Sequence, residues 1–416
     1  MTDLAFEVPH FADGMCHLTT YEDISAVLAS TSFSVQRGSD PRFVDDTLVN
    51  IDGEHHLRRR RLENQLFTAA HRARYEREVL VPLVDRYVDE IEAGCEQGQT
   101  ARVDLVELGL TLLVHIAAAI TGLDGIDTAD DARRLLHFAD SLALSTNAHF
   151  TRLGTAEQEA LIEEGLAERQ VFVDELFAPS VERRRALLAG LAEGTVHEFD
   201  VPHDLITLFL KHQVEDHTDD LLLRELSIYL HASIRTSTRM VCHSFEHLFG
   251  WIEAHSEDRD AIDDPIFLRA VIEETMRMHV VLPLLLRRAL EDFEVPSGRA
   301  IKEGEMVALL FAEANRDPAV WGPSADVFDP RREAPDRMKQ YGLAFGAGEH
   351  LCIGKRTALG GGGPASDPTL GSVLLILTRI LRAGGRLDPD SPPVMNAGSY
   401  YDEHLTFPIV FAPRSS

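Results

Sequence analysis

The feature that most constrains the fold is a long stretch without helix breakers in the middle of the chain. From residue 219 the sequence reads DDLLLRELSIYLHASIRTSTRMVCHSFEHLFGWIEAH, with no proline and no glycine before Gly250. Because proline and glycine are the residues that most strongly interrupt helices, this stretch predicts one very long helix. A helix of that length in a globular protein is expected to cross its whole domain.

The rest of the pattern is also mostly helical. Periodicity predicts a short helix in TYEDISAVLAST, an amphipathic helix over 69–94 and a buried helix over 103–123. Strand signals are confined to 293–312, which alternates around a Pro-Ser-Gly turn, and to HLTFPIVFAP near the end. Since no linker rich in proline, glycine or serine divides the chain, we expect a mainly α fold with a minor β-sheet region, in a single domain over residues 1–416.

Composition excludes several classes of protein. The 68 acidic and 40 basic residues give a formal charge of −28, which disfavours binding to nucleic acid. No apolar run reaches the roughly 20 residues that span a bilayer, and the N-terminus lacks the basic region of a secretory signal. The four cysteines show no CxxC spacing, which argues against structural zinc and a disulfide framework. We therefore expect a cytoplasmic protein without a membrane anchor.

One of these cysteines lies in a glycine-rich segment, FGAGEHLCIG. Glycine lets the backbone approach a neighbouring atom closely, so backbone N–H groups can surround a thiolate here. A buried cysteine in an ordinary turn is the simplest alternative. A dinucleotide-binding loop is excluded because no strand-Gly-x-Gly-x-x-Gly-helix order is present.

The segment resembles the haem-binding loop of the cytochrome P450 family, whose pattern is F-x-x-G-x-H-x-C-x-G. The matching residues are Phe345, Gly348, His350, Cys352 and Gly354. The resemblance implies a haem b cofactor with Cys352 as the axial ligand of its iron. It also implies that His350 faces a haem propionate.

A second match supports this resemblance. EETMRMH contains Glu274 and Arg277, which are neighbours at i,i+3 on a helix and resemble the family's E-x-x-R pair. The segments LRRALEDFEVPSG, EANRDPAVW and FDPRR follow in the family's order. The resemblance implies that Glu274 and Arg277 support the thiolate side of the haem, and that Arg287 contacts a propionate.

A third match is IDGEHHLRRRRLENQLF, which resembles the family's H-x-x-x-R helix. His55 and Arg59 lie four residues apart, and two cations suit two propionates. The neighbouring arginines are expected to form a surface patch that offers docking charge to an acidic redox partner; they are Arg58, Arg60 and Arg61.

The long helix carries the most informative departure. The family's central I helix, which lies over the haem, has the pattern A-G-x-(D/E)-T, whereas this chain has ASIRT. Thr236 keeps the family's alcohol, but Arg235 replaces the acid, and a guanidinium only donates hydrogen bonds. Four interpretations stay open: Thr236 suffices with water; Arg235 binds a substrate carboxylate; the substrate brings its own activated N–O or O–O bond; or Arg235 turns away to a buried acid.

We therefore expect a haem-thiolate monooxygenase of secondary metabolism, with Thr236 and Arg235 as its candidate catalytic residues. It would oxidise a small organic or natural-product substrate with O₂ and electrons from ferredoxin and ferredoxin reductase. The alternatives are a redox-partner-independent enzyme, either a peroxygenase or one that rearranges an activated substrate, and a haem-binding protein without catalysis. Substrate contacts are expected from loop 37–47, from segment 280–286, and specifically from Ile234, Val281, Leu284 and Leu285.

Three smaller features complete the expectation. The run Gly360–Gly363 predicts a loop insertion over about 359–369 that breaks the helix after the cysteine, and partner docking at that face would then be altered or absent. A tolerated surface loop is the alternative. The N-terminal portion is expected to be shorter than is usual in the family. His243 and His247 lack an H-E-x-x-H pattern, so we expect them on the solvated side of the long helix rather than in a zinc site.

Overall fold

The computed structural model of the chain describes residues 7–36, 38–96, 100–212, 218–361 and 367–412. Its internal contacts divide into two interleaved compact units. The sheet unit comprises residues 1–37, 81–109 and 236–416, and the helical unit comprises residues 38–80 and 110–235. All described strands lie in the sheet unit, so the expectation of a mainly α fold with a minor β region is confirmed. A single domain over the whole chain stays a prediction.

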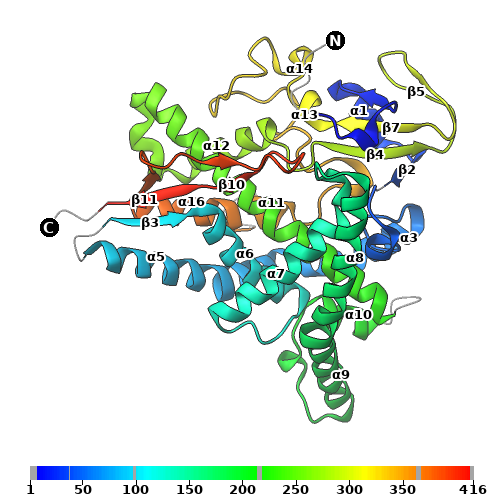
Figure 1. Ribbon diagram of the computed structural model, residues 1–416, viewed down its shortest axis with the longest axis vertical. Helices are drawn as coiled ribbons and strands as arrows, with labels where there is room; N and C mark the ends of the chain where they lie inside the picture. Colours follow the sequence, from blue (N-terminus) through cyan, green and yellow to red (C-terminus); the bar gives the residue numbers. More distant parts are fainter. Residues whose placement is uncertain (1–6, 37, 97–99, 213–217, 362–366, 413–416) are drawn as a thin grey trace. The chain divides into compact units, whose positions relative to one another are not determined.

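The main sheet of the sheet unit has four strands, in the order β1-β7-β4-β2 (Figure 1). Strands β1 and β7 are parallel, and the other two pairs are antiparallel. Because β4 lies between β2 and β7, its residue Arg287 pairs with a residue on each side. The bounds are β1 (Cys16–Leu18), β2 (Phe33–Gln36), β4 (Leu284–Ala289) and β7 (Met306–Leu310).

Helix α1 (Tyr21–Ala29) covers this sheet and completes a hydrophobic core. Thr20 begins the helix, because its side chain accepts a hydrogen bond from the backbone N–H of Asp23. Ile24 and Val27 then point into the core, where they meet Val307 and Leu309 of β7. The short helix predicted in TYEDISAVLAST is therefore confirmed.

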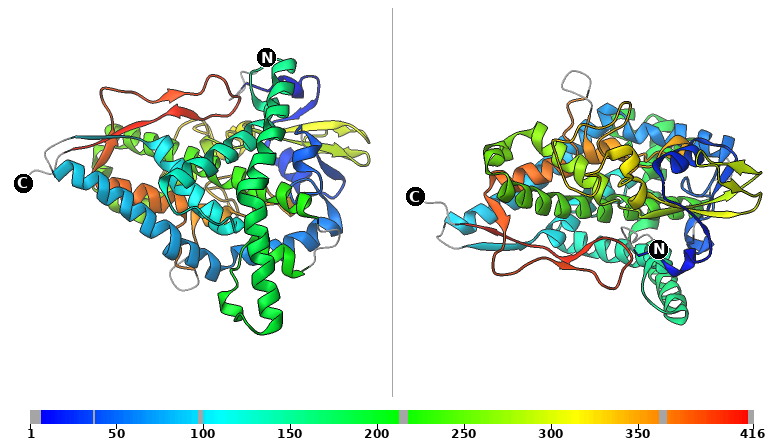
Figure 2. Two further views of the ribbon diagram at one scale, coloured as in Figure 1. Left: turned by 60° about the horizontal axis from the view of Figure 1, so that its bottom comes forward. Right: turned by 90° about the horizontal axis from the view of Figure 1, so that it is seen from above.

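Helix α16 (Ser372–Arg382) packs against several other helices of the sheet unit. It contacts both α5 (Val81–Glu96) and α12 (Pro265–Met278), and Figure 2 shows α5 and α16 side by side. Helix α12 begins where Asp264 accepts a hydrogen bond from the N–H of Ile266 and Pro265 supplies its first residue. The end of this helix, at Met278, is close to the segment that enters β4.

The smaller elements of the sheet unit include a three-stranded sheet, in the order β3-β11-β8, and two strand pairs, β5 with β6 and β9 with β10. Their bounds are β3 (Ala101–Asp104), β5 (Phe293–Glu294), β6 (Ala300–Ile301), β8 (Gly385–Leu387), β9 (Val394–Met395), β10 (His404–Thr406) and β11 (Pro408–Phe411). The short helices are α13 (Phe311–Ala314), α14 (Pro318–Trp321) and α15 (Lys355–Leu359).

The long helix is present as α11 (Asp219–Ala254), which has 36 residues and confirms the prediction. Its residues up to Arg235 belong to the helical unit, and those from Thr236 belong to the sheet unit. The helix predicted over 69–94 consists of α4 (Ala69–Tyr75), one π-helical turn (Glu76–Leu80) and α5. The helix predicted from residue 103 begins later, as α6 (Leu105–Thr121), because residues 101–104 pair with β11 as strand β3.

The helix after the cysteine loop is interrupted, as the glycine run predicted. Helix α15 ends at Leu359, and α16 begins only at Ser372. Gly360 and Gly371 both have a positive φ, and a Cβ on Gly371 would lie 2.2 Å from the backbone N of Gly360. The two ends of the insertion therefore touch each other. Gly362 and Gly363 lie outside the described residues.

The helical unit is built from α7 and α8, which pack against each other, together with the shorter helices beside them. The bounds are α2 (Pro41–Val44), α3 (Gly53–Glu63), α7 (Ala129–Thr146), α8 (Thr155–Phe172), α9 (Ala178–Glu193) and α10 (Leu205–His212). At the crossing of α7 and α8 a Cβ on Gly165 would lie 1.8 Å from Ser145 Oγ and 2.3 Å from Ser145 Cβ. Only glycine fits at this crossing.

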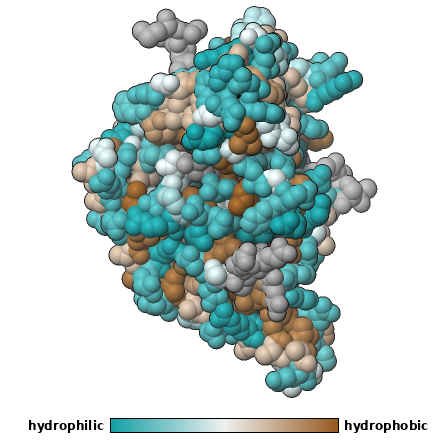
Figure 3. Space-filling view, turned by 90° about the vertical axis from the view of Figure 1, so that its right-hand side faces the viewer, coloured by the Kyte–Doolittle hydropathy of each residue, from teal (hydrophilic) through white to brown (hydrophobic). Residues whose placement is uncertain are grey.

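Figure 3 shows that hydrophilic side chains cover most of the face it displays, while hydrophobic ones form separate patches. This distribution agrees with the formal charge of −28. None of the described helices combines the length and apolar character that a membrane span requires.

The helix crossing yields a prediction for stability. Replacing Gly165 by alanine should lower the free energy of unfolding by about 1–3 kcal/mol, because Ser145 Cβ is attached directly to the backbone of α7 and cannot rotate away. Gly94→Ala is the matched control, since no atom lies within 4 Å of the added Cβ in helix α5. Chemical denaturation of both variants measures the difference, and equal stability of the two would contradict the proposed contact.

Candidate functional site

The predicted iron ligand lies in a loop whose backbone is tightly turned. The backbone N–H of Cys352 donates a hydrogen bond to the carbonyl of Phe345, at 3.0 Å, which closes the loop. Gly348 has φ +68°, and a Cβ there would lie 2.0 Å from the carbonyl oxygen of Leu28 on α1. The loop therefore needs glycine at position 348 in order to sit against α1. Cys352 is exposed, whereas Cys16, Cys95 and Cys242 are buried.

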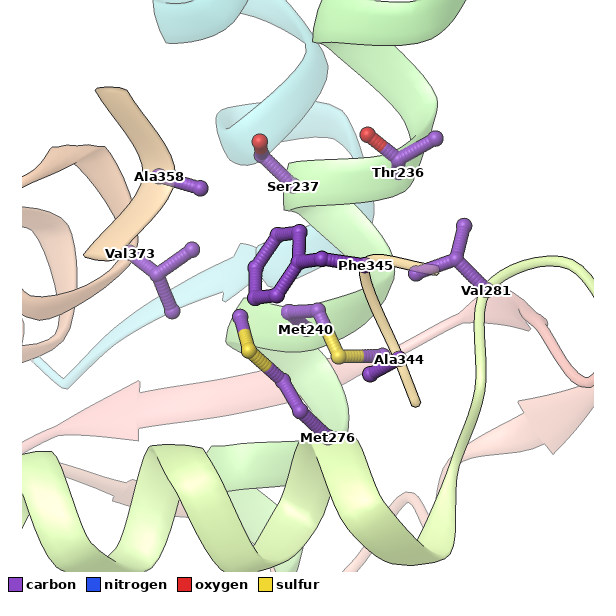
Figure 4. Close-up of a pocket in the computed structure, with 9 residues that line it drawn as sticks. All are labelled: Thr236, Ser237, Met240, Met276, Val281, Ala344, Phe345, Ala358 and Val373. Carbon is purple, nitrogen blue, oxygen red and sulfur yellow. The ribbon is translucent and has the colours of Figure 1, made fainter. Parts of the chain in front are cut away.

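Beside this loop lies a pocket that brings together three of the predicted site residues. Thr236 comes from α11, Phe345 from the cysteine loop and Val281 from the segment before β4 (Figure 4). The other lining residues are Ser237, Met240, Met276, Ala344, Ala358 and Val373. Apart from the hydroxyls of Thr236 and Ser237, the lining is apolar. The pocket thus places apolar side chains and two hydroxyls next to Phe345, the residue whose carbonyl accepts the hydrogen bond from Cys352.

Three other sequence-predicted residues belong to the same sheet unit. A Cβ on Gly354 would lie 4.0 Å from Cys352 Sγ, which is an ordinary van der Waals contact, so the space beside the sulfur does not itself require glycine here. His350 ends a short 3₁₀ turn and is half-buried. Arg287 is only 5% exposed although it is a cation, and one of its N–H groups donates to the carbonyl of Leu286 at 2.9 Å. The donor set thus contains a thiol, an imidazole and a guanidinium, which fits an iron porphyrin with acidic propionates.

The predicted pair on α12 forms completely. Arg277 and Glu274 make two charge-assisted hydrogen bonds, of 2.7 and 2.9 Å, and both side chains are fully buried. Arg277 also donates to the backbone carbonyls of Asn315 and Ala325, each at 2.7 Å. When every carboxylate oxygen and guanidinium N–H has a hydrogen-bond partner, these bonds offset the desolvation cost of a buried ion pair. It ties α12 to the coil that precedes the cysteine loop.

Two further residues complete this network, and sequence reasoning did not single them out. Arg332 Nε donates to Glu274 Oε1 at 3.1 Å, and Gln340 Nε2 donates to Glu274 Oε2 at 2.7 Å. Arg332 lies in the FDPRR segment, so the family's order of segments was the signal that could have identified it. No sequence pattern pointed to Gln340.

The predicted propionate contacts on α3 lie in a different environment from the one expected. His55 is exposed, while Arg59 is only 2% exposed and forms ion pairs with Glu63 and Glu225. Its guanidinium also lies over the ring of Phe209, 4.8 Å from the centroid. Within the helical unit Arg59 thus neutralises buried carboxylates rather than presenting its charge outward.

The same helix contains a second pair with four-residue spacing. His56 and Arg60 follow His55 and Arg59 by one residue, and His56 is fully buried. Arg60, which we expected in a surface patch, is half-buried, whereas Arg58 and Arg61 are exposed.

The two carboxylates around Arg59 share one cation. Glu225 accepts hydrogen bonds from Arg59 Nη2, at 2.6 Å, and from the backbone N–H of Leu48, at 2.9 Å. Glu63 accepts from Arg59 Nε at 3.2 Å and from the hydroxyl of Tyr229 at 2.7 Å. Burial, and secondly the charge of Glu63, raises the pKa of Glu225 to about 8.

Arg235, the residue that replaces the family's acid, is paired within the helical unit. Its Nε donates to Asp140 Oδ1 of α7 at 2.8 Å, and both side chains are 28% exposed. The geometry matches the fourth interpretation most closely, in which the arginine turns to an acid, although Asp140 is only partly buried.

The remaining candidates for substrate contact lie elsewhere. Leu284 is 2% exposed and pairs with Leu310 inside the main sheet, and Leu285 packs against the core beneath α1. Ile234 is 1% exposed and belongs to the helical unit. None of these three lines the pocket around Phe345. Arg37, the first residue of the predicted contact loop, lies outside the described residues.

The expectation for His243 and His247 was wrong. His243 is only 2% exposed, and burial, followed by the neighbouring His279, lowers its pKa to about 3. The same two causes lower the pKa of His247 to about 4. This side of α11 is covered by the end of α12 and by the segment that leads into β10, so it does not face solvent.

Comparisons with known proteins agree with this geometry. The Cytochrome P450 family model matches residues 253–359, which include the α12 pair and the cysteine loop. The chain is 30% identical over 381 residues to nocardicin C N-oxygenase of Nocardia uniformis subsp. tsuyamanensis, covering 86% of this chain and 81% of that relative. It is also 36% identical over 104 residues to cytochrome P450 71A12 of Arabidopsis thaliana, a match that spans 24% of this chain and only 21% of the plant protein.

Solved structures of cytochromes P450 share the fold of this chain. A crystal structure of P450BioI, in complex with an acyl carrier protein ligated to hexadec-9Z-enoic acid, aligns with a TM-score of 0.71. The alignment covers 95% of this chain and 92% of that one at 20% sequence identity.

The raised pKa of Glu225 predicts how stability depends on pH. Because the folded protein holds this proton more tightly than the unfolded chain, stability is greatest below the ordinary glutamate pKa near 4.5 and falls as pH rises towards about 8. Glu225→Gln should flatten this decline, since the amide cannot ionise. Denaturant unfolding near pH 5 and near pH 9 measures the slope. The exposed Glu182→Gln is the control, and the prediction fails if both variants keep the wild-type slope.

Proposed function

Because the chain belongs to the cytochrome P450 family of oxidoreductases, we propose that it is a haem-thiolate monooxygenase acting on a small organic or natural-product substrate. The observation that carries this proposal is the placement of Cys352 on a tightly turned loop whose first residue, Phe345, shares an apolar pocket with Thr236. A thiol that is exposed beside such a pocket is what a haem ligand requires.

The residues of the sheet unit take the following roles towards haem b. Cys352 donates its thiolate, and the hydrogen bond between its N–H and the Phe345 carbonyl holds the loop in shape. Arg287 and His350 bind propionates, because cations next to an apolar pocket pair with carboxylates. Gly348 lets the loop pack against α1. When bound, the haem supplies the activation of O₂ with electrons from a redox partner.

On α3 we assign the propionate contacts to His56 and Arg60 in place of His55 and Arg59. Both pairs have the family's spacing, but Arg59 already neutralises Glu63 and Glu225, and His55 is exposed. Withdrawing Arg59 from those acids would break the buried ion pairs that it forms with Glu63 and Glu225, which is unfavourable.

We propose that the hydroxyl of Thr236 takes part in proton transfer in the pocket. Its hydroxyl and that of Ser237 are the polar side-chain groups of the lining, so water that enters the pocket has these two partners. Val281, on another wall, is the candidate for contact with the substrate. Arg235 supports this chemistry indirectly, by its ion pair with Asp140 across α7 and α11.

The names of the relatives suggest the kinds of substrate and partner. One relative is named as an N-oxygenase of nocardicin C, and P450BioI was solved with an acyl carrier protein. We propose a natural-product substrate for this chain, with ferredoxin and ferredoxin reductase as electron donors in the cytoplasm. Two observations favour the redox-partner-independent alternative: Arg235 replaces the family's acid, and the helix after the cysteine loop is interrupted at the face where a partner would dock.

Two measurements test the proposed function together. The reduced protein should show the red-shifted Soret band of thiolate-bound haem with carbon monoxide, and Cys352→Ser should abolish this band while Cys16→Ser keeps it. Substrate oxidation should then require NAD(P)H with a surrogate ferredoxin and its reductase. Turnover with hydrogen peroxide alone would favour the partner-independent enzyme, and absence of the band would refute the haem-thiolate assignment.

A second test concerns the ion pair of Arg235. If the pair only joins α7 to α11, Arg235→Gln and Asp140→Asn should each lower the free energy of unfolding by about 0.2–1 kcal/mol, with non-additive effects in the double variant. Binding of long-chain carboxylates, followed by the spectral shift of the haem, should be the same in both. A selective loss of carboxylate affinity in Arg235→Gln would instead show that the arginine binds an acidic substrate.

A further inference from the structure

A group of imidazoles lies inside the sheet unit, apart from the pocket around Phe345. It joins the C-terminal half of α11, the residue that follows α12, and the segment that enters β10. We refer to it as the histidine cluster, defined as His243, Glu246, His247, His279, Asp402 and His404. His243 and His404 are buried, His247 and His279 are partly buried, and the hydrogen bonds of each ring decide what it can bind.

The hydrogen bonds of His243 determine its tautomer. Its Nε2 lies 3.1 Å from the backbone carbonyl oxygen of Asp402, and because a carbonyl only accepts, Nε2 carries the hydrogen. The lone pair is therefore on Nδ1. This Nδ1 is buried and has no hydrogen-bond partner among the residues that the structure describes. Metal-binding histidines show this arrangement, with one ring N–H donated to a backbone carbonyl and the other nitrogen directed at the ion.

Two other members of the cluster stand beside the ring of His243. His404 is 7% exposed, its Nε2 lies 3.3 Å from Glu246 Oε2, and its Nδ1 also lacks a partner within the described part of the chain. Glu246 follows His243 by three residues, so both side chains leave the same face of α11. One ligand atom from each of His243, Glu246 and His404 lies within 4.8 Å of the others.

His279 and Asp402 form a second combination with His243, but their ligand atoms are already engaged. His279 Nδ1 lies 2.5 Å from Asp402 Oδ2, and His279 Nε2 lies 2.7 Å from His247 Nε2. With a hydrogen-bond partner on each ring nitrogen, His279 has no lone pair to spare. These residues instead surround His243 and hold it, through the Asp402 carbonyl and the stacked His279 ring.

We propose that His243, His404 and Glu246 bind a zinc ion, with water as the fourth ligand. Two imidazoles and one carboxylate are a known ligand set for Zn²⁺ with an open position. Ligand distances of about 2.0–2.2 Å in a tetrahedron place the ligand atoms roughly 3.3–3.5 Å apart, so the present spacing must close by about 1.5 Å at most. Rotation of the Glu246 side chain, which is 50% exposed, provides this movement and the route for the ion from solvent.

The ion would fasten the segment that enters β10 to α11. One helical turn before His243, Arg239 already makes such a connection, because it donates to Glu403 at 2.8 Å and lies over the ring of Tyr401. Arg239 also donates to the carbonyl of Val281, at 3.4 Å, and Val281 lines the pocket beside Thr236. Zinc would therefore steady one wall of that pocket without taking part in the chemistry.

Calorimetric titration of the chelator-treated haem protein with Zn²⁺ tests the site. The wild type should bind about one ion per chain, and His404→Gln and Glu246→Gln should each weaken binding by at least about tenfold. Zn²⁺ should raise the melting temperature of the wild type and leave that of the two variants unchanged. Co²⁺ bound at the site should show the absorption of tetrahedral coordination. An unchanged carbon monoxide spectrum shows that a variant is folded.

His255→Gln is the matched control, since His255 Nδ1 lies 3.5 Å from Glu257 Oε1 on the exposed surface and belongs to none of the possible metal-ligand groups among the described residues. This variant should bind Zn²⁺ as the wild type does. The proposal is overturned if the wild type binds no zinc, or if His279→Gln abolishes binding while His404→Gln and Glu246→Gln retain it. Loss of binding in His255→Gln would likewise place the ion at the surface.

Discussion

The buried ion pair of Glu274 and Arg277 is the interaction on which the sheet unit depends. Each charge is fully removed from water, and such a pair persists only when every donor and acceptor has a partner. Arg277 therefore holds backbone carbonyls of the coil after β7, and Glu274 holds Arg332 and Gln340 from the same coil. That coil has almost no regular secondary structure of its own. Its path from α14 to the cysteine loop is held by these two opposite charges of α12, together with the contacts of Arg331 with Asp258 and of Asn315 with Leu343.

The same principle explains how a strongly acidic chain uses its arginines. Arg59 lies between two buried glutamates, Arg235 pairs with Asp140, and Arg239 pairs with Glu403. In each case a cation compensates an acid that burial would otherwise make costly. Arg235 is the instructive case. It occupies the position of the family's acid, where an arginine is unusual. Its side chain pairs with an acid on α7, so the arginine also forms an ordinary contact between two helices.

Much of the candidate site followed from local sequence. The cysteine loop, the α12 pair and Thr236 are each specified by residues close together in the chain, and the structure brings Thr236, Val281 and Phe345 to one pocket. The register on α3 did not follow in this way. The letters HH and RRRR satisfy a four-residue spacing in two registers, and only the burial of one histidine and the ion pairs of one arginine distinguish them.

The sequence by itself determined the elements, because helix length, glycine turns and i,i+3 pairs depend on residues within a few positions of one another. It identified α11 and the interrupted helix after the cysteine loop, and it predicts Cys352 as the thiolate ligand. Only the tertiary structure decided which polar side chains are buried. His243 looked solvated in the helix pattern, yet it is covered by His279 and His404, which lie far along the chain. The helical period of a sequence tells on which face of a helix a residue lies. Whether that face is buried depends on packing between segments that are distant in the chain.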